Sequence, residues 1–306
     1  MDTRSWEMTV FARVVELGSF SAAAEKLRLT PSAVSKLVTR TEERLGVSLL
    51  QRSTRQLTLT SEGRHFHEAC LRILADIDEA EAGLGSGDAA PRGLLRVNTS
   101  VPFGTHHVVP LLAAFSARYP DVTVDLSLSD ALVDLQREQT DVAIRMGPLA
   151  DATFRARKLG DSRRAVVASP AYLARHGTPA ALADLAAHRC LNFNFRRSLD
   201  EWPFLVDGRT ELLPVQGGML TNNGETMRQL VLEGLGIARL GMFHIARDLA
   251  DGRLIEVLAD FNPGDLEEIH VIFRNQKHMP ARVRVFIDFL VERFEGAARG
   301  WAATPA

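Results

Sequence analysis

The sequence predicts an N-terminal all-α winged helix-turn-helix domain, a long linker helix, and a C-terminal α/β domain with two lobes. An amphipathic helix over residues 4–17 precedes residues 19–59, which read as two short helices, a tight turn between them and a basic hairpin. Residues 62–84 have apolar side chains at helical spacing, and after Leu94 strand patterns alternate with helical ones. A chain of 306 residues with 46% hydrophobic content can form more than one core.

Capping residues define the two short helices. Ser21 is expected to cap the helix Ala22–Leu27. Thr30 can cap the next helix, Pro31–Leu45, whose first position suits proline because its N–H has no partner there. Gly46 fits the left-handed conformation that ends many helices. These signals predict a helix-turn-helix.

The helix Pro31–Leu45 has one apolar and one polar face. We expect its inward stripe to comprise Val34, Val38, Thr41 and Leu45. A second helix with small polar and basic residues outward fits a DNA major groove, where Leu37 can touch a thymine methyl. The hairpin, Leu49–Arg52 with Gln56–Leu59, would bring arginines to phosphate or to the minor groove. The residues expected to contact DNA are Ser32, Ser35, Lys36, Leu37, Thr39, Arg40, Arg52 and Arg55. A solvated helical pair would show the same polar face, but the basic hairpin favours DNA binding.

The linker helix predicts an oligomer. From Phe66 to Leu84 the apolar positions are spaced alternately by four and three residues, as in a short coiled coil; they are Phe66, Cys70, Ile73, Ile77, Ala80 and Leu84. A helix packed inside one domain could show the same stripe. Because the wing precedes this helix and a glycine-rich linker (83–93) follows it, we expect no intramolecular partner and favour a dimer seam.

The remaining chain predicts strands and helices in alternation, which is typical of a parallel α/β sheet. Two such units with two crossover strands are typical of the periplasmic-binding-protein architecture. The expected strands are 94–98, 122–128, 141–145, 165–168, 190–195, 215–220, 236–240 and 268–273. The expected helices are 105–118, 131–138, 170–176, 179–187, 225–233 and 281–294, with a polar, irregular stretch after residue 195.

The motifs quoted next carry a family resemblance. Residues 20–63, FSAAAEKLRLTPSAVSKLVTRTEERLGVSLLQRSTRQLTLTSEG, resemble the N-terminal domain of LysR-type transcriptional regulators. DVAIRMG (141–147), ASPAYLARHGTP (168–179), HRCLNF (188–193) and GLGIARLG (234–241) resemble later segments of the same family. Thr41 departs from the family's usual buried leucine, and Leu37 stands where a polar residue is common. The resemblance implies a DNA-binding regulator that assembles through its linker helix, as a dimer of dimers.

A small-molecule effector is expected between the two lobes, beyond the carboxyl ends of the strands. Two helix N-termini, one after Asn98–Gly104 and one after Thr221–Glu225, offer N–H groups that suit an anion such as a carboxylate. The expected effector-binding residues are Ser100, Pro102, Phe103, Ser129, Arg145, Phe195, Thr221, Asn222 and Asn223. Several have equally plausible structural roles: Ser100 and Asn223 as helix caps, the two phenylalanines as core, and Arg145 as an ion-pair partner of Asp130.

No pattern for catalysis or for a metal is recognised, and we expect neither an enzyme nor a cofactor. The pair His106-His107 lacks Cys, Asp or Glu at ligand spacing, and Gly234-Leu-Gly236 precedes a strand instead of following one. Cys70 and Cys190 are far apart in sequence, which fits a reducing cytoplasm. Neither a signal peptide nor an apolar run of membrane-spanning length is recognised.

Charge is distributed unevenly along the chain. Residues 1–60 have nine Lys and Arg against six Asp and Glu, whereas the rest has 27 against 32. A net positive N-terminal segment in an otherwise net negative chain is typical of a protein whose N-terminal part binds double-stranded DNA.

We therefore expect a DNA-binding domain at 1–60, a dimerisation helix and hinge at 61–92, and an effector domain at 93–306. Lobe one would comprise 93–163 and 266–306, and lobe two 164–265. An α/β enzyme with an accessory DNA-binding head is one alternative, which an active-site triad or metal cluster would favour. An architectural DNA protein with a filled cleft is the other.

Overall fold

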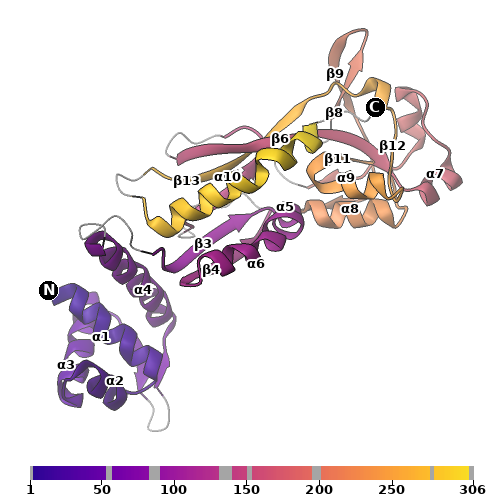
Figure 1. Ribbon diagram of the computed structural model, residues 1–306. Coiled ribbons are helices and arrows are strands. Elements are labelled where there is room, and N and C mark those ends of the chain that lie inside the picture. Colours follow the sequence, from indigo (N-terminus) through magenta and orange to yellow (C-terminus); the bar gives the residue numbers. More distant parts are fainter. Residues whose placement is uncertain are drawn as a thin grey trace. The chain divides into compact units, whose positions relative to one another are not determined.

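The computed structural model describes residues 3–52, 57–82, 90–130, 140–149, 154–194, 201–275 and 279–302. The chain forms two compact units, Met1–Leu94 with Asp121–Thr123, and Leu95–Pro120 with Val124–Ala306. Among the described helices, none combines the length and apolar character that crossing a bilayer requires. The predicted helical N-terminal domain and α/β C-terminal domain are both confirmed (Figure 1).

The described residues of the N-terminal unit form four helices and a two-stranded hairpin. Its elements are α1 (Thr3–Leu17), α2 (Phe20–Leu27), α3 (Pro31–Leu45), β1 (Leu50–Arg52), β2 (Leu57–Leu59) and α4 (Ser61–Ala82). The hairpin is antiparallel, with Leu50 opposite Leu59. Its turn, residues 53–56, lies outside the described residues.

The capping of α3 confirms the predicted boundaries. The Thr30 hydroxyl accepts a hydrogen bond from the Ala33 N–H, and Gly46 is left-handed with φ of 71°. The predicted cap of α2 is wrong: Ser19, not Ser21, accepts the Ala22 N–H at 3.3 Å, because the helix begins earlier, at Phe20.

The core of this unit joins all four helices. Val10 and Phe11 of α1, and Val34 and Val38 of α3, are fully buried. Thr41 is also buried, whereas Leu45, predicted on the same stripe, is 38% exposed because it lies in the last turn of α3.

The expectation that α4 lacks an intramolecular partner is wrong. Cys70 is fully buried in the core, and the Phe66 ring lies 5.3 Å from the ring of Phe11 on α1. The first part of the predicted seam therefore packs within the chain. Ile73 and Ile77 are half-buried.

The C-terminal unit is built on one large mixed sheet. The strand order is β11-β6-β13-β5-β3-β4, with β12 paired to β6. The strands are β3 (Gly93–Thr99), β4 (Val122–Leu128), β5 (Val142–Met146), β6 (Phe154–Ala168), β11 (Ala238–Gly241), β12 (Ile255–Glu256) and β13 (Leu266–Arg274). β3 and β5 are parallel as predicted, but β13 runs opposite to both of its neighbours, β5 and β6. The prediction of a parallel sheet is therefore only partly correct.

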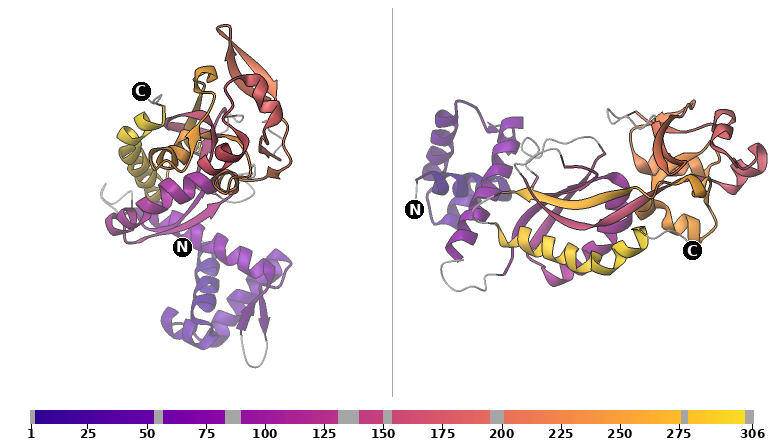
Figure 2. Two further views of the ribbon diagram at one scale, coloured as in Figure 1. Left: turned by 90° about the vertical axis from the view of Figure 1, so that its right-hand side faces the viewer. Right: turned by 90° about the horizontal axis from the view of Figure 1, so that it is seen from above.

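Two long strands connect the two ends of this unit. The first half of β6 pairs with β13, and its second half pairs with β11 and β12 (Figures 1 and 2). Helix α10 (Ala281–Ala302) packs along β6. A separate core surrounds the second half of β6, and includes Val166, Tyr172, Trp202 and Ile237.

Shorter elements complete the unit. They are α5 (Val101–Phe103), the π-helix η1 (Gly104–Val108), α6 (Val109–Arg118), α7 (Pro170–His176), η2 (Leu182–Ala187), β7 (Asn192–Phe193), β8 (Glu201–Val206), β9 (Arg209–Pro214), β10 (Leu220–Thr221), α8 (Gly224–Leu232), α9 (Met242–Ala250) and η3 (Ala259–Phe261). The helical stretch predicted to be capped by Thr105 or by residues before it begins at Val101, with Ser100 as its cap. The stretch expected to be irregular after residue 195 contains the β8–β9 hairpin, whose turn has Asp207 and Gly208 both at positive φ. The helix expected at 131–138 lies outside the described residues.

Candidate functional site

Helix α3 presents a polar face away from the core. Because Val34, Val38 and Thr41 are buried, the opposite side is left to solvent, and Ser32 and Lys36 on it are exposed. Ser35 and Thr39 are partly exposed, and Leu37 packs partly against the domain core. The side chain of Arg52 and all of Arg55 lie outside the described residues. The predicted residues of α3 therefore share one helix, and the part of that helix with small and basic side chains is accessible.

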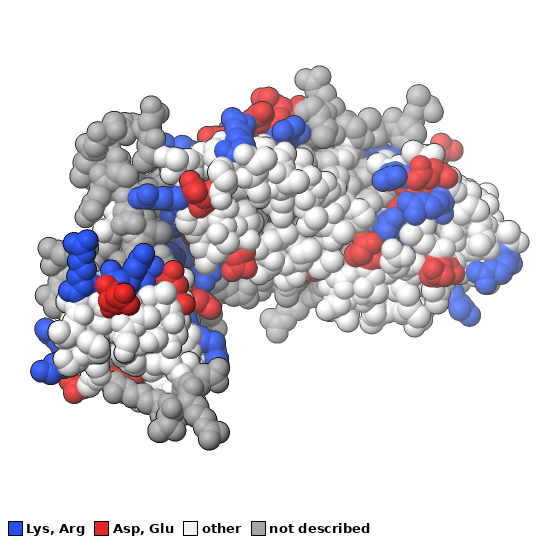
Figure 3. Space-filling view, turned by 60° about the horizontal axis from the view of Figure 1, so that its bottom comes forward, with Lys and Arg blue, Asp and Glu red and all other residues white. Residues whose placement is uncertain are grey.

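Arg40 has an acidic partner within the domain. Its Nε lies 3.3 Å from Oε1 of Glu7, and Nη2 of Arg44 lies 3.1 Å from Oε2 of the same carboxylate. Glu7 is only 2% exposed, whereas Arg40 is 65% exposed. A buried carboxylate is costly unless it is paired, so both arginines stabilise the docking of α1 on α3. On the face of the molecule drawn in Figure 3, acidic and basic side chains of the described residues are likewise interspersed.

The start of the wing is fixed by hydrogen bonds to side chains. Oε1 of Glu42 accepts the N–H groups of Leu49 and Leu50 at 2.8 and 3.2 Å. The Thr60 hydroxyl accepts the N–H of Gly63 at 2.8 Å. A Cβ at Gly63 would lie 1.9 Å from the carbonyl oxygen of Leu49, so only glycine allows this approach of α4 to the wing.

In the C-terminal unit the two predicted helix ends meet at one carboxylate. Oδ1 of Asp130 accepts the N–H of Val101 at 2.8 Å, and Oδ2 accepts the N–H of Gly224 at 2.9 Å. The two helix N-termini expected to bind an anion therefore do lie together, and a carboxylate of the chain itself occupies their N–H groups. Gly224 permits this approach, since a Cβ there would lie 3.0 Å from the Pro102 ring.

The other predicted effector residues are partly structural. Ser100 and Asn223 cap α5 and α8, accepting the N–H groups of Phe103 and Thr226. Arg145 donates to Oδ1 of Asn98 at 2.7 Å. Phe103 is fully buried, and Pro102 and Thr221 are buried.

Positions nearer to solvent complete the predicted set. Asn222 is exposed, and Ser129 is partly exposed with its N–H bonded to the Thr99 carbonyl. Phe195 lies outside the described residues.

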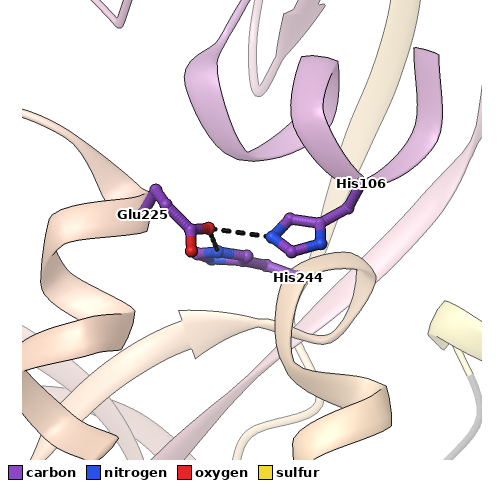
Figure 4. Close-up of side chains that lie close together, drawn as sticks. All are labelled: His106, Glu225 and His244. Atoms are coloured by element: carbon purple, nitrogen blue, oxygen red, sulfur yellow. Dashed lines mark hydrogen bonds and ion pairs between the residues drawn. The ribbon is translucent and has the colours of Figure 1, made fainter. Parts of the chain in front are cut away.

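A third feature was not predicted: two histidines meet one carboxylate. Nε2 of His106, in η1, and Nε2 of His244, in α9, each lie 2.8 Å from Oε2 of Glu225, in the first turn of α8 (Figure 4). The hydrogen bond from His244 holds the pKa of Glu225 well below its usual range, against the opposing effect of burial. Burial lowers the pKa of His244, although Glu225 partly offsets this effect. These partners are 119 and 138 residues from His106, so spacing could not reveal them.

Comparison with protein families identifies both units. Residues 6–64 match the bacterial regulatory helix-turn-helix protein model of the lysR family, and residues 88–295 match the LysR substrate binding domain. The chain belongs to the LysR family of transcriptional regulators.

The LysR relatives are similar over almost the whole chain. The HTH-type transcriptional regulator CrgA of Neisseria meningitidis serogroup C is 42% identical over 95% of this chain and 97% of its own length. The HTH-type transcriptional regulator DmlR of Escherichia coli is 33% identical over 94% of each chain. The solved structure of Neisseria meningitidis CrgA has a TM-score of 0.64 at 42% identity, covering 94% of this chain and 98% of that one. The full-length structure of the Vibrio cholerae virulence activator AphB has a TM-score of 0.59 at 28% identity, covering 94% and 98%.

This LysR membership settles the class of protein. It is a transcriptional regulator with a helix-turn-helix DNA-binding domain and an effector-responsive substrate-binding domain, and not an enzyme. It binds DNA and small-molecule effectors and forms oligomers, as LysR regulators do.

Proposed function

We propose that α3 enters the major groove of a dyad-symmetric operator and reads it from the face opposite Val34 and Val38. The observation that carries this proposal is the division of α3 into a fully buried apolar side and an accessible side with Ser32 and Lys36. Helices of this kind contact base edges mainly through their N-terminal half. Ser32, Ser35, Lys36, Leu37, Thr39 and Arg40 form the proposed reading face, and Arg52 and Arg55 of the wing would contact the DNA backbone.

The test compares two exposed lysines. Lys36→Ala should weaken operator binding by ~1–3 kcal/mol if Lys36 contacts a base, or lower the salt slope by roughly one if it contacts phosphate. Lys26→Ala, on α2, removes the same charge from an exposed position outside the proposed face and serves as the control. Operator affinity would be measured by fluorescence anisotropy at several salt concentrations. Equal losses in both variants would show that only net charge matters, and would refute this face.

We infer that the DNA-binding heads are linked in pairs through α4. Ile73 and Ile77 are half-buried in the single chain, whereas Phe66 and Cys70 are already used by the intramolecular core. The proposed seam is therefore the C-terminal half of α4, and a dimer of dimers is the proposed complete assembly. Within this assembly we assign 1–60 to DNA binding, 61–92 to dimerisation and 93–306 to effector binding. Because its target is chromosomal DNA, the cytoplasm is the proposed location.

For the effector we propose a small anionic metabolite between lobe one (93–163 and 266–306) and lobe two (164–265). Support comes from the two backbone N–H groups that Asp130 now engages, since such groups at helix N-termini favour any carboxylate. The effector's acid group would compete with Asp130 for them. The Thr99 hydroxyl also supports a polar ligand here, because it is buried without a hydrogen-bond partner among the described residues.

A thermal-shift screen of carboxylates and aromatic acids tests this proposal. A ligand at ~100-fold its dissociation constant adds about 2.7 kcal/mol to the stability of the folded state. Asn222 directly follows β10 and is exposed, and Asn222→Ala should reduce the shift for any hit. A hit whose shift is identical in wild type and Asn222→Ala would place its site elsewhere, and its chemical conversion by the protein would favour the enzyme alternative.

A further inference from the structure

The cluster of His106, Glu225 and His244 has the donor atoms of a metal site. One ring nitrogen of each histidine and one carboxylate oxygen of Glu225 all lie within 4.8 Å of one another, and both Nε2 atoms point at the same oxygen (Figure 4). Each residue comes from a different element, η1, α8 or α9, so the convergence depends on tertiary packing. We propose that these three side chains bind a divalent transition-metal ion of the Zn²⁺ type.

The ligand chemistry fits this class of ion. Imidazole nitrogen and carboxylate oxygen bind Zn²⁺ at about 2.0–2.2 Å, usually with four ligands in a tetrahedron. Two tetrahedral ligands are then roughly 3.3 Å apart. Each Nε2–Oε2 distance here is 2.8 Å, so binding requires both to lengthen by about half an ångström, which side-chain rotation can supply. The metal would replace the two hydrogens that now link the rings to Glu225.

Neighbouring groups already hold the carboxylate in position. Nη1 of Arg228 donates to Oε1 of Glu225 at 2.9 Å, which leaves Oε2 toward the histidines. Arg228 is itself held by Asp248, through Nη2 to Oδ1 at 2.8 Å. Such outer hydrogen bonds orient metal ligands and are part of well-formed sites.

The cluster is accessible to an ion and to water. The His244 side chain is 2% exposed, but that of His106 is 32% exposed, and both line a cavity of about 550 Å³. Water from this cavity would supply the remaining ligand. The charges of the surrounding arginines are offset by carboxylates. Arg228 and Arg253 share Asp248, and Arg247 pairs with Asp251. Because Arg228 also pairs with Glu225, the three arginines face three carboxylates, and the two histidines would supply the neutral ligands.

The experiment uses the full-length chain without a polyhistidine tag. Zn²⁺ binding is measured by competition with a chromophoric chelator, and Co²⁺ binding by its visible d–d absorption. We expect one ion per chain in the wild type. His106→Gln removes the most exposed ligand and should lower the affinity at least ~100-fold, since even the loss of an outer-sphere partner costs 10–100-fold. The Co²⁺ absorption should disappear with it.

Two comparisons make the result decisive. His176→Gln, an exposed histidine on α7, should bind as the wild type does. The melting temperatures of the metal-free proteins should agree, which shows that His106→Gln is folded. The proposal is overturned if the wild type binds no ion, if His106→Gln retains the wild-type affinity, or if His176→Gln loses as much affinity as His106→Gln.

Discussion

Replacing Asp130 with alanine tests whether its carboxylate stabilises the two helix N-termini, and whether an added carboxylate can take its place there. The substitution removes two hydrogen bonds to backbone N–H groups, at 2.8 Å from Val101 and 2.9 Å from Gly224. A hydrogen bond to a charged group contributes about 1.5–3 kcal/mol to stability. Asp130 is partly exposed, so we take the lower end of that range, about 3 kcal/mol for both bonds. For a domain of this size the melting temperature should fall by ~6–12 °C.

The assay is thermal denaturation with added formate, compared with chloride at equal ionic strength. Alanine leaves both N–H groups without their carboxylate, so formate should raise the melting temperature of Asp130→Ala more than that of the wild type. Asp125→Ala is the matched control, since Asp125 is 51% exposed and pairs with Arg96 at 3.5 Å, a contact that contributes about 0–1 kcal/mol. Equal formate effects in Asp130→Ala and wild type, or no loss of stability in Asp130→Ala, would refute the assignment of Asp130 to these helix ends.

Three further outcomes are expected. Gly63→Ala should destabilise the N-terminal domain by several kcal/mol (~2–4), measured by denaturant titration, because its Cβ would lie 1.9 Å from the Leu49 carbonyl oxygen and backbone must move. Ile73→Asp combined with Ile77→Asp should dissociate the oligomer in sedimentation experiments and weaken operator binding, since unpaired carboxylates are costly in a buried seam; an intact oligomer would place the seam elsewhere. Burial raises the pKa of the Cys70 thiol to about 12, so iodoacetamide at pH 8 should modify this thiol only after the protein unfolds, as mass spectrometry can show. Because the pKa is raised in the folded state, the thiol stabilises the folded state below pH 9. This contribution to stability is lost as the pH rises toward 12.

Local chemistry made the DNA-binding domain predictable. Thr30, Pro31 and Gly46 define the ends of α3 through backbone groups only a few residues away, and the structure confirms all three. Where a competing local signal existed, the boundary was wrong: two serines flank Phe20, and the cap is Ser19 instead of Ser21.

Missed elements in the C-terminal unit fall into two kinds. Asp207-Gly208 is a strong hairpin signal, since both residues accept positive φ, and it could have revealed β8 and β9. The first part of β6, Phe154–Gly160, is charged and largely exposed, so no apolar alternation marks it as a strand. Its pairing with β13, more than 100 residues away, gives it that structure.

The site residues were harder to predict than the fold. The sequence pointed to the N-termini that follow Ser100 and Asn223, but not to Asp130 as their common partner. His106 was set aside as a metal ligand because spacing only detects ligands on the same element, and Glu225 and His244 are distant in sequence. Contacts of this kind arise from packing, which a single sequence does not encode in its local pattern.

Because Arg40 pairs with the buried Glu7, its binding to a DNA phosphate would exchange one ionic partner for another. To reach a phosphate, the Arg40 guanidinium must leave a carboxylate 3.3 Å away, while Arg44 remains to neutralise Glu7 and keep α1 docked. Counterion release depends on how many phosphates are neutralised by charges brought to the DNA. Arg40, Arg44 and Glu7 together therefore add one unit of net positive charge to that process, although they include two arginines. The affinity for DNA should therefore decrease less steeply with salt concentration than the number of lysines and arginines on α3 predicts, because Glu7 on α1 offsets one of those charges.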